Sequence, residues 1–344
     1  MKLLLPSLAL LLLVPPAREG VELAYAPAEG TVLKRLFVAE ASYRLTDMAA
    51  SIDGEPVPHD GELPEYAMSF VERIAVTDTL ESVADGRPTA LLRRFDELGQ
   101  ENTDSAGDEE RTVEYASPLE GRSVRFTWDA DEEEYAVEAA DEEELDEDLA
   151  AWLAEDLDLR RLLPEGEVEP GDEWELDPEL YLAFMWPGGL LDFHPDGEEP
   201  DPDDRAPSRQ TIERLEGEGT ARLEELREED GVRVAVIHVE LEITTGSESV
   251  LPALDEDELE EGQFPRPEIT IEVEIERTLT GTILWDLEHG HALSAELECE
   301  ASRLVTEAWT LEGETEDGEA VSADVEQSRM MEGTVRYTAS IERE

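Results

Sequence analysis

The sequence predicts a mainly β protein of the α+β class, with long, curved antiparallel sheets or a half-barrel and one packed helix at about 141–163. Apolar and polar residues alternate with a period of two along most of the chain. Turn-forming residues separate the alternating segments, as hairpins require. Only residues 141–163 have apolar side chains at helical spacing. We therefore expect a sheet with one face buried and the other in water.

The alternation is clearest in the C-terminal half. Segments 268–285, 291–311 and 321–341 each place apolar side chains at odd positions and mostly polar ones between them. Strands of this length far exceed the usual five or six residues, and such strands twist and coil. Gly281 and Gly333 are therefore expected to mark bends in two of them.

Hairpin turns are predicted where glycine follows a polar residue between two alternating segments. Gly290 is expected to adopt a left-handed conformation, and Asp230-Gly231 predicts a second hairpin upstream. The N-terminal half repeats the pattern in less regular segments, which include 33–45, 68–80 and 123–128.

One helix is predicted, with Asp141 as its N-cap and Glu144 completing a capping box. It ends before Pro164, and its apolar face consists of Leu145, Leu149, Trp152, Leu153 and Leu157. The helix closes an N-terminal β-rich lobe of residues 28–163. Residues 164–344 are then expected to form a C-terminal antiparallel β lobe.

The first seventeen residues have the features of an export signal. Lys2 precedes an apolar run from Leu3 to Val14, and Pro-Pro-Ala follows. The run is short for a membrane span, although an uncleaved N-terminal anchor is the alternative. No cysteine follows it, and Cys299 is alone, so neither a lipid anchor nor an intrachain disulfide is expected. We expect an exported, soluble protein, periplasmic or extracellular and not lipid-anchored.

The charge balance is strongly acidic, with 91 acidic and 26 basic residues and a net charge of −65. Such a charge destabilises a compact chain by self-repulsion, which dissolved salt relieves by screening. Lysine occurs only at positions 2 and 34. The composition therefore predicts adaptation to salt; mutational bias towards arginine would explain the missing lysines but not the excess of acids. Nucleic acid and anionic membrane surfaces are excluded as partners because both would repel the chain.

Residues 162–176 contain Leu163-Pro164, then Val168, then Gly171-Asp172-x-Trp174. In this signature the chain resembles a diffuse group of exported bacterial proteins of unknown function. The group is distantly similar in pattern to the half-barrel periplasmic lipoprotein carriers, which wrap a sheet around an apolar ligand. The resemblance covers about the C-terminal half and implies a curved, half-open sheet. Independently of it, Pro170-Gly171 predicts a turn and Trp174 a return to the core.

Motifs of catalysis are absent: there is no G-x-S-x-G, H-E-x-x-H or P-loop. Cys299 lies on the apolar face of its segment, which predicts a buried, inert thiol. His289 and His291 lack an evident third ligand and are expected to be solvated rather than to bind metal. The acidic clusters match no EF-hand and are expected to condense cations diffusely. No catalytic residue, metal or cofactor is therefore predicted.

Residues 180–195 form an apolar island that contains one formal charge, Asp192. Two interpretations remain open. The island either closes the open end of a curled sheet as part of the core, or lines and gates a cavity, with residues 187–189 as a hinge. In the second case it would contact a lipid or another hydrophobic ligand. The candidate ligand-binding residues are then Trp174, Tyr181, Phe184, Trp186 and Phe193.

Three functions are compatible with these patterns. The favoured one is a non-catalytic structural or interaction role in the cell envelope or extracellular space, in salt. The alternative is a carrier or binder of a hydrophobic ligand, a lipid or lipoprotein, in a half-barrel cavity. The second alternative is a hydrolase that uses paired carboxylates. Diffuse cations are expected partners in every case, and the oligomeric state is open.

The net charge of −65 predicts that salt stabilises the fold. The melting temperature should rise as sodium chloride increases from about 0.1 M to about 1 M, because the Debye length shortens from about 10 Å to about 3 Å. Scanning calorimetry measures this. Sodium perchlorate should act in the same direction at the lower concentrations, where screening outweighs ion-specific effects. A melting temperature that is flat or falls in both salts would contradict salt adaptation.

Overall fold

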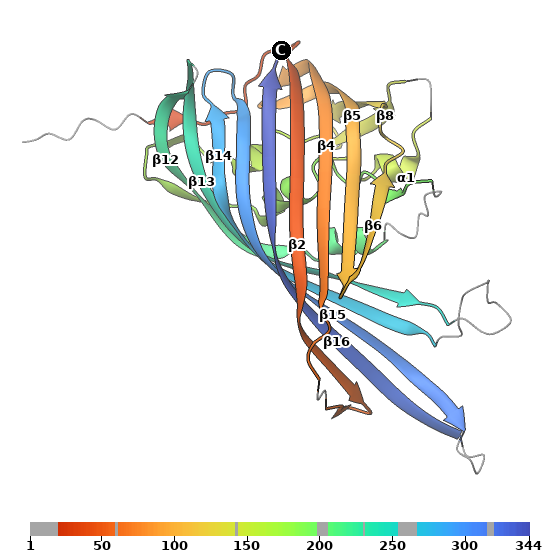
Figure 1. Ribbon diagram of the computed structural model, residues 1–344. Helices are drawn as coiled ribbons and strands as arrows, with labels where there is room; N and C mark the ends of the chain where they lie inside the picture. Colours follow the sequence, from red (N-terminus) through yellow and green to blue (C-terminus); the bar gives the residue numbers. More distant parts are fainter. Residues whose placement is uncertain are drawn as a thin grey trace, which may run out of the picture.

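The chain is mainly β, as the alternation predicts, with few and short helices (Figure 1). The computed structural model describes residues 20–58, 61–141, 144–197, 206–229, 231–253, 267–314 and 320–344. The predicted export signal lies outside these ranges, as do Asp230 and the acidic clusters 201–204 and 255–261. No helix in the described residues is long and apolar enough to cross a membrane.

Long strands account for most of the described chain. The strands are β1 Val21–Glu22, β2 Val32–Ile52, β3 Glu55–Pro56, β4 Tyr66–Ala84, β5 Arg87–Ala106, β6 Glu109–Ala116, β7 Ser123–Asp129, β8 Glu134–Ala139, β9 Glu167–Val168, β10 Glu173–Leu176, β11 His194–Pro195, β12 Glu216–Glu229, β13 Val232–Leu251, β14 Ile269–Asp286, β15 His291–Glu314 and β16 Ala320–Arg343. The helices are α1 Glu147–Ala150, α2 Leu182–Met185 and α3 Ala206–Glu213, with 3-10 turns η1 Arg160–Leu162 and η2 Pro178–Tyr181. The three C-terminal strands match the three predicted segments closely.

A single antiparallel sheet contains strands of both sequence halves. Its strand order is β10-β12-β13-β14-β15-β16-β2-β4-β5-β6-β11, with β3, β7 and β8 joined at the side. The two halves meet where β16 pairs with β2, from Val325 opposite Ile52 to Arg343 opposite Leu33. The sheet is open, because β10 and β11 stand at its two ends.

Glycines lie where neighbouring strands approach too closely for a side chain. A Cβ at Gly281 would lie 2.2 Å from the Glu296 carbonyl oxygen, and one at Gly333 would lie 2.1 Å from that of Ser42. Both positions permit the coiling predicted for strands of this length. Gly290, with φ of 65°, has the left-handed conformation predicted for the β14–β15 hairpin.

The inner, concave face of the sheet is covered by two segments that together form the plug: residues 146–163 and 177–193. They lie behind the sheet in Figure 1. Apolar side chains of the plug, including Leu157, Leu180 and Tyr181, pack against the inward-facing residues of the strands. The core is therefore a single layer between the sheet and the plug.

The helix predicted at 141–163 is much shorter than expected. Only α1 is helical, and its N-cap is Asp146 rather than Asp141, whose carboxylate accepts hydrogen bonds from Arg122 instead. Of the leucines at helical spacing, Leu149, Leu153 and Leu157 are buried and Leu145 is half-buried. The helix does not continue, because the carbonyl of Ala154 accepts a hydrogen bond from Arg93 of the sheet. Further along, Leu159 has a left-handed φ of 54°, which no α-helix contains.

Arg93 of β5 attaches the plug to the sheet. Its Nε and Nη2 donate to the carboxylate of Asp78 on β4 at 2.8 and 2.9 Å. Its Nη1 and Nη2 also donate to the carbonyls of Ala154 and Glu155 in the plug, at 2.7 and 2.8 Å. If the helix continued, these two carbonyls would instead accept hydrogen bonds from backbone N–H groups of the helix.

Arg35 of β2 makes the second attachment. Its guanidinium hydrogen-bonds Asp78 of β4 and Asp158 of the plug, and all three side chains are buried. Two arginines and two aspartates thus balance their charges inside the core, which a buried charge requires. The four side chains form one network, the anchor, which joins three strands to the plug.

Removal of Arg93 should be strongly destabilising, because Asp78 and two plug carbonyls lose donors inside the core. We expect Arg93→Met to lower the free energy of unfolding by about 3–5 kcal/mol. Urea denaturation at constant high salt measures this. The control is Arg125→Met, whose ion pair with Glu81 is solvent-exposed and should cost less than about 1 kcal/mol. Equal effects of the two substitutions would contradict the role of the anchor.

Candidate functional site

The apolar island of residues 180–195 spans the opening of the curved sheet. Trp174 just upstream belongs to the edge strand β10, and Phe193 directly precedes β11 at the other edge. Tyr181 and Phe184, 0% and 4% exposed, point into the core, where both rings contact Tyr337 of β16. The structure therefore brings these two candidate residues together, but not Trp174 and Phe193.

The Pro187-Gly188-Gly189 turn is held in place by backbone hydrogen bonds. The carbonyl of Gly188 accepts from Ala154 N–H at 2.9 Å, and Leu190 N–H donates to the carbonyl of Trp152 at 3.0 Å. A Cβ at Gly189 would lie 2.0 Å from the Trp152 carbonyl oxygen. The glycine thus permits a close contact between the two plug segments.

Trp186 borders a small crevice between the two plug segments and α3. The crevice has a volume of about 240 Å³. Its lining is mainly apolar and includes Trp152, Leu182, Ala183 and Ile212, with Arg161 and Glu179 among the remaining residues. The other half-buried candidate, Trp174, donates its indole N–H to the carbonyl of Leu162 at 2.8 Å.

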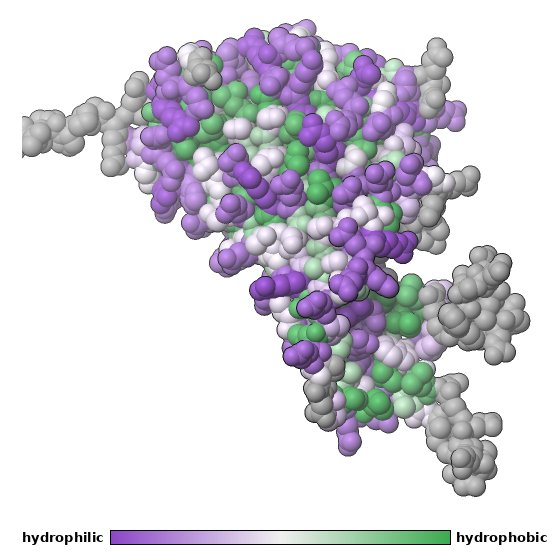
Figure 2. All heavy atoms as spheres, in the orientation of Figure 1, coloured by the Kyte–Doolittle hydropathy of each residue, from purple (hydrophilic) through white to green (hydrophobic). Residues whose placement is uncertain are grey.

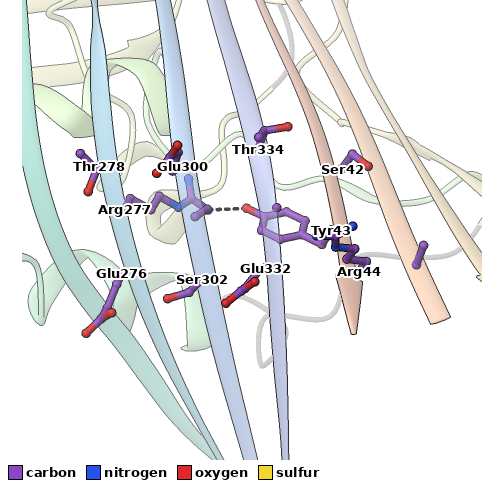
Figure 3. Close-up of a pocket in the computed structure, with 13 residues that line it drawn as sticks. Ser42, Tyr43, Arg44, Glu276, Arg277, Thr278, Glu300, Ser302, Glu332 and Thr334 are labelled. Atoms are coloured by element: carbon purple, nitrogen blue, oxygen red, sulfur yellow. Dashed lines mark hydrogen bonds between the residues drawn. The ribbon is translucent and has the colours of Figure 1, made fainter. Parts of the chain in front are cut away.

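Arg277 of β14 lies on the inner face at the lower end of the plug, where the sheet narrows. Its Nη1 donates to the hydroxyls of Tyr181 and, at 2.5 Å, Tyr337, and its Nη2 lies 3.4 Å from the hydroxyl of Tyr43. Figure 3 shows Arg277 reaching towards Tyr43. We call this part of the sheet the waist.

No described carboxylate balances the charge of Arg277. Burial raises the pKa of Tyr337 to about 12 and also raises that of Tyr181, so these hydroxyls remain neutral near pH 7. The Nε of Arg277 is buried and has no acceptor in the described residues. The positive charge of Arg277 is therefore not neutralised by any described side chain.

Arg303 of β15 is the second unbalanced arginine at the waist. It lies directly opposite Ile275, one inward-facing position beyond Arg277 on β14. Arg303 makes no hydrogen bond with the described residues. Its Nε is buried, whereas its two Nη atoms are not among the buried unsatisfied atoms. Burial lowers its pKa, although a guanidinium stays charged at neutral pH. Arg329 of β16 follows on the same face but pairs with Glu307.

The outer face of the waist carries the opposite charge. An open depression of about 660 Å³ lies there, lined by Glu276, Glu300 and Glu332 together with hydroxyl side chains and Arg44 (Figure 3). Arg277 and Tyr43 also contribute to its lining. These glutamates are exposed. No group of three metal-ligating side chains occurs among the described residues. The depression is therefore a solvated acidic surface.

The two loop histidines are less solvated than the sequence suggested. His291 is 1% exposed, and its Nδ1 lies 2.8 Å from the carbonyl oxygen of Ala292. The Nδ1 of His289 lies 2.7 Å from Asp286, which also caps the hairpin turn. Cys299 is buried as predicted, and burial raises the pKa of its thiol to about 11.

The unbalanced arginines could have been found in the sequence. Arg277 and Arg303 occupy odd positions in segments where most odd positions are apolar, which is the register that faces inward. Glu72 of β4 breaks its own segment in the same way. Arginines and glutamates are so common elsewhere in these strands that the break in the pattern does not by itself distinguish these residues.

Comparisons with known proteins identify no family. No protein-family model matches the chain, and no curated protein sequence matches it. One solved structure, described as "Asymmetric conductivity of engineered proteins", has 9% identity and a TM-score of 0.14, covering 89% of this chain and 99% of that one. Another, a "TodX deltaS2S3 mutant monoaromatic hydrocarbon channel", has 8% identity and a TM-score of 0.08, with 91% of each chain covered. At these TM-scores neither bears on the fold or the function.

Glu72 should make stability depend on pH. Its side chain is 7% exposed, and burial raises its pKa from 4.5 to about 8. The folded state therefore holds a proton that the unfolded state releases between these values, so stability falls as pH rises through this window. Relative to Glu72→Gln, the free energy of unfolding of the wild type should fall by at most about 1.4 kcal/mol per pH unit from pH 4.5 to 8.

Urea denaturation at several pH values measures the difference between wild type and variant. Glu40→Gln is the matched control, because Glu40 is exposed on the neighbouring strand β2 and its substitution removes the same formal charge. A parallel pH dependence of wild type and Glu72→Gln would show that Glu72 is ionised in the folded protein.

Proposed function

We propose that the protein binds a hydrophobic ligand on the inner face of its sheet beyond the plug. The observation that carries this proposal is that β13 to β16 and the end of β2 continue past the plug as a tail (Figure 1). The tail comprises residues 48–52, 246–251, 269–275, 303–311 and 323–331. Its inward-facing positions remain largely apolar. Helix α3 covers this face at β13, where Thr245 and Ser247 are buried, whereas the inward-facing side chains of β14 are only half-buried.

The tail exposes apolar side chains that a monomer would normally bury. Figure 2 shows hydrophobic residues along the narrow lower part of the molecule. Ile52 and Leu311 are 45% and 49% exposed, and the inward-facing side chains of β14 are only half-buried. A contiguous apolar surface of this kind is typical of a binding site. Apolar contact also suits a salty environment, because salt does not screen it.

The hydrolase hypothesis has less support. Two carboxyl groups have pKa values raised by burial, as general acids do. The pKa of Glu155 is raised to about 7, in contact with Arg160, whereas burial alone raises that of Glu72. Neither carboxyl influences the other, so the two do not form the coupled pair that acid–base hydrolysis uses.

The exposed tail is also compatible with the structural or interaction hypothesis, because an apolar surface can bind a protein partner. What favours a small hydrophobic ligand over a protein partner is the narrowness of the apolar surface. On β13 the inward-facing neighbours of the β14 apolar row are Thr245, Ser247 and Ser249. On β15 the inward-facing neighbours alternate between charged and apolar side chains, in the order Arg303, Val305, Glu307 and Trp309. The only uninterrupted apolar row of these three strands is therefore that of β14, and a single row fits an acyl chain better than a protein surface of the usual size.

Substitution in the tail should weaken binding of a neutral apolar probe. Val273 and Val305 lie directly opposite each other on the inner face. We expect the wild type to bind N-phenyl-1-naphthylamine, and the double variant Val273→Thr, Val305→Thr to bind it about tenfold more weakly, because two buried hydroxyls would face the ligand. Probe fluorescence gives the dissociation constants.

The control is Val71→Thr, the same change at an exposed residue on the outer face of β4. Val71→Thr should leave the affinity unchanged. Absence of probe binding by the wild type, and of any lipid in an organic extract of the purified protein, would overturn the proposed function. Undiminished binding by the double variant would move the site to the crevice beside Trp186.

A further inference from the structure

We propose that the ligand is a long-chain carboxylate, with its headgroup on Arg303 at the waist and its chain along β14 in the tail. This inference rests on the proposed function and adds the chemical class of the ligand. It comes from the two unbalanced arginines at the upper end of the apolar tail.

Unbalanced arginines are unexpected in this composition. The chain has 91 acidic residues for 26 basic ones, so almost any arginine could find a carboxylate nearby. Arg35 and Arg93 do so in the anchor, and Arg329 does so on the same face as Arg303. The described groups that interact electrostatically with Arg277 and Arg303 are tyrosines, Cys299 and arginines, Arg329 included, and none of them is a carboxylate. Keeping acids away from them costs stability unless an anion occupies the space.

The two arginines play different parts. The Nη1 of Arg277 donates to two tyrosine hydroxyls, and its Nε is buried. These contacts hold the Arg277 side chain in place, and it adds positive charge to the site beside Arg303. Arg303 has no hydrogen bond in the described chain, and its two Nη groups keep access to solvent. Arg303 can therefore present its pair of N–H donors to both oxygens of a carboxylate, the geometry in which guanidinium binds most strongly.

The apolar row of the tail starts at this headgroup position. Arg303 lies directly opposite Ile275, and Val273, Ile271 and Ile269 follow on the inner face of β14. These residues span about 20 Å at the usual rise per residue of a strand. The row ends beside Trp309 of β15, which lies opposite Ile269. A single extended acyl chain can follow this row with its charged end at Arg303.

A carboxylate suits the site better than a phosphate monoester. The net charge of −65 repels every anion, and the repulsion grows with the charge of the ligand. A phosphate monoester carries about −1.5 to −2 near pH 7, whereas a carboxylate carries a single charge. Two guanidinium groups carry one positive charge more than a single carboxylate neutralises, so the preference for a carboxylate rests on the repulsion from the net charge of the chain.

The test compares two probes with the same chain, cis-parinaric acid and its methyl ester, by fluorescence titration of the full-length protein. The wild type should bind the acid about ten- to a hundredfold more tightly than the ester. Arg303→Gln should lose this preference and keep its affinity for the ester. Arg44→Gln, which removes an exposed arginine from the outer face of the waist, should keep the preference.

Equal binding of acid and ester by the wild type would overturn the headgroup assignment and leave the proposed function intact. Failure to bind acid, ester and N-phenyl-1-naphthylamine alike would overturn both. Displacement of parinaric acid by oleoyl-lysophosphatidate at lower concentration than by oleate would overturn the choice of a carboxylate. Arg303→Gln should unfold in no less urea than the wild type; a large loss of stability would make Arg303 structural and contradict the inference.

Discussion

The ion network of Arg35, Arg93, Asp78 and Asp158 is the interaction on which the architecture depends. An open, curved sheet has an apolar concave face that must be covered, and here two plug segments cover it without a disulfide or a long helix. The anchor holds the first segment, 146–163, by its backbone carbonyls as well as by Asp158. It thereby determines how deep the plug sits, and where the uncovered part of the sheet begins.

Charged residues are distributed differently on the two faces of the sheet. The even positions of the long strands carry acids into water, where salt screens them, and the few bases that face inward are arginines. At the anchor these arginines are balanced within the chain. At the waist Arg277 and Arg303 are not, although carboxylates line the outer face of the same strands. We therefore interpret the paired arginines of the anchor as structural and the unpaired arginines of the waist as a candidate site.

Much of the fold follows from residue pattern alone. The period-two segments at 268–285, 291–311 and 321–341 became β14 to β16, because alternation requires one wet and one dry face. Helical spacing at 141–163 identified Leu149, Leu153 and Leu157 as core residues but not their conformation, because plug carbonyls accept hydrogen bonds from Arg93 of the sheet. The candidate site depends on pairing between strands far apart in sequence, which no local pattern contains. Arg277 meets Tyr181, Tyr337 and Tyr43 only because β14 lies two strands from β16 and faces the plug.

The acidic surface and the arginines at the waist act on an anionic ligand over different distances. Repulsion from the net charge extends through solvent and is largely screened once the Debye length shrinks to about 3 Å in molar salt. A contact between Arg303 and a carboxylate at the half-buried waist is screened much less, and the apolar contact along β14 is not screened at all. Salt therefore removes the barrier to approach while it preserves most of the binding energy. A protein with this charge can thus hold an anion in molar salt that it would exclude in dilute buffer.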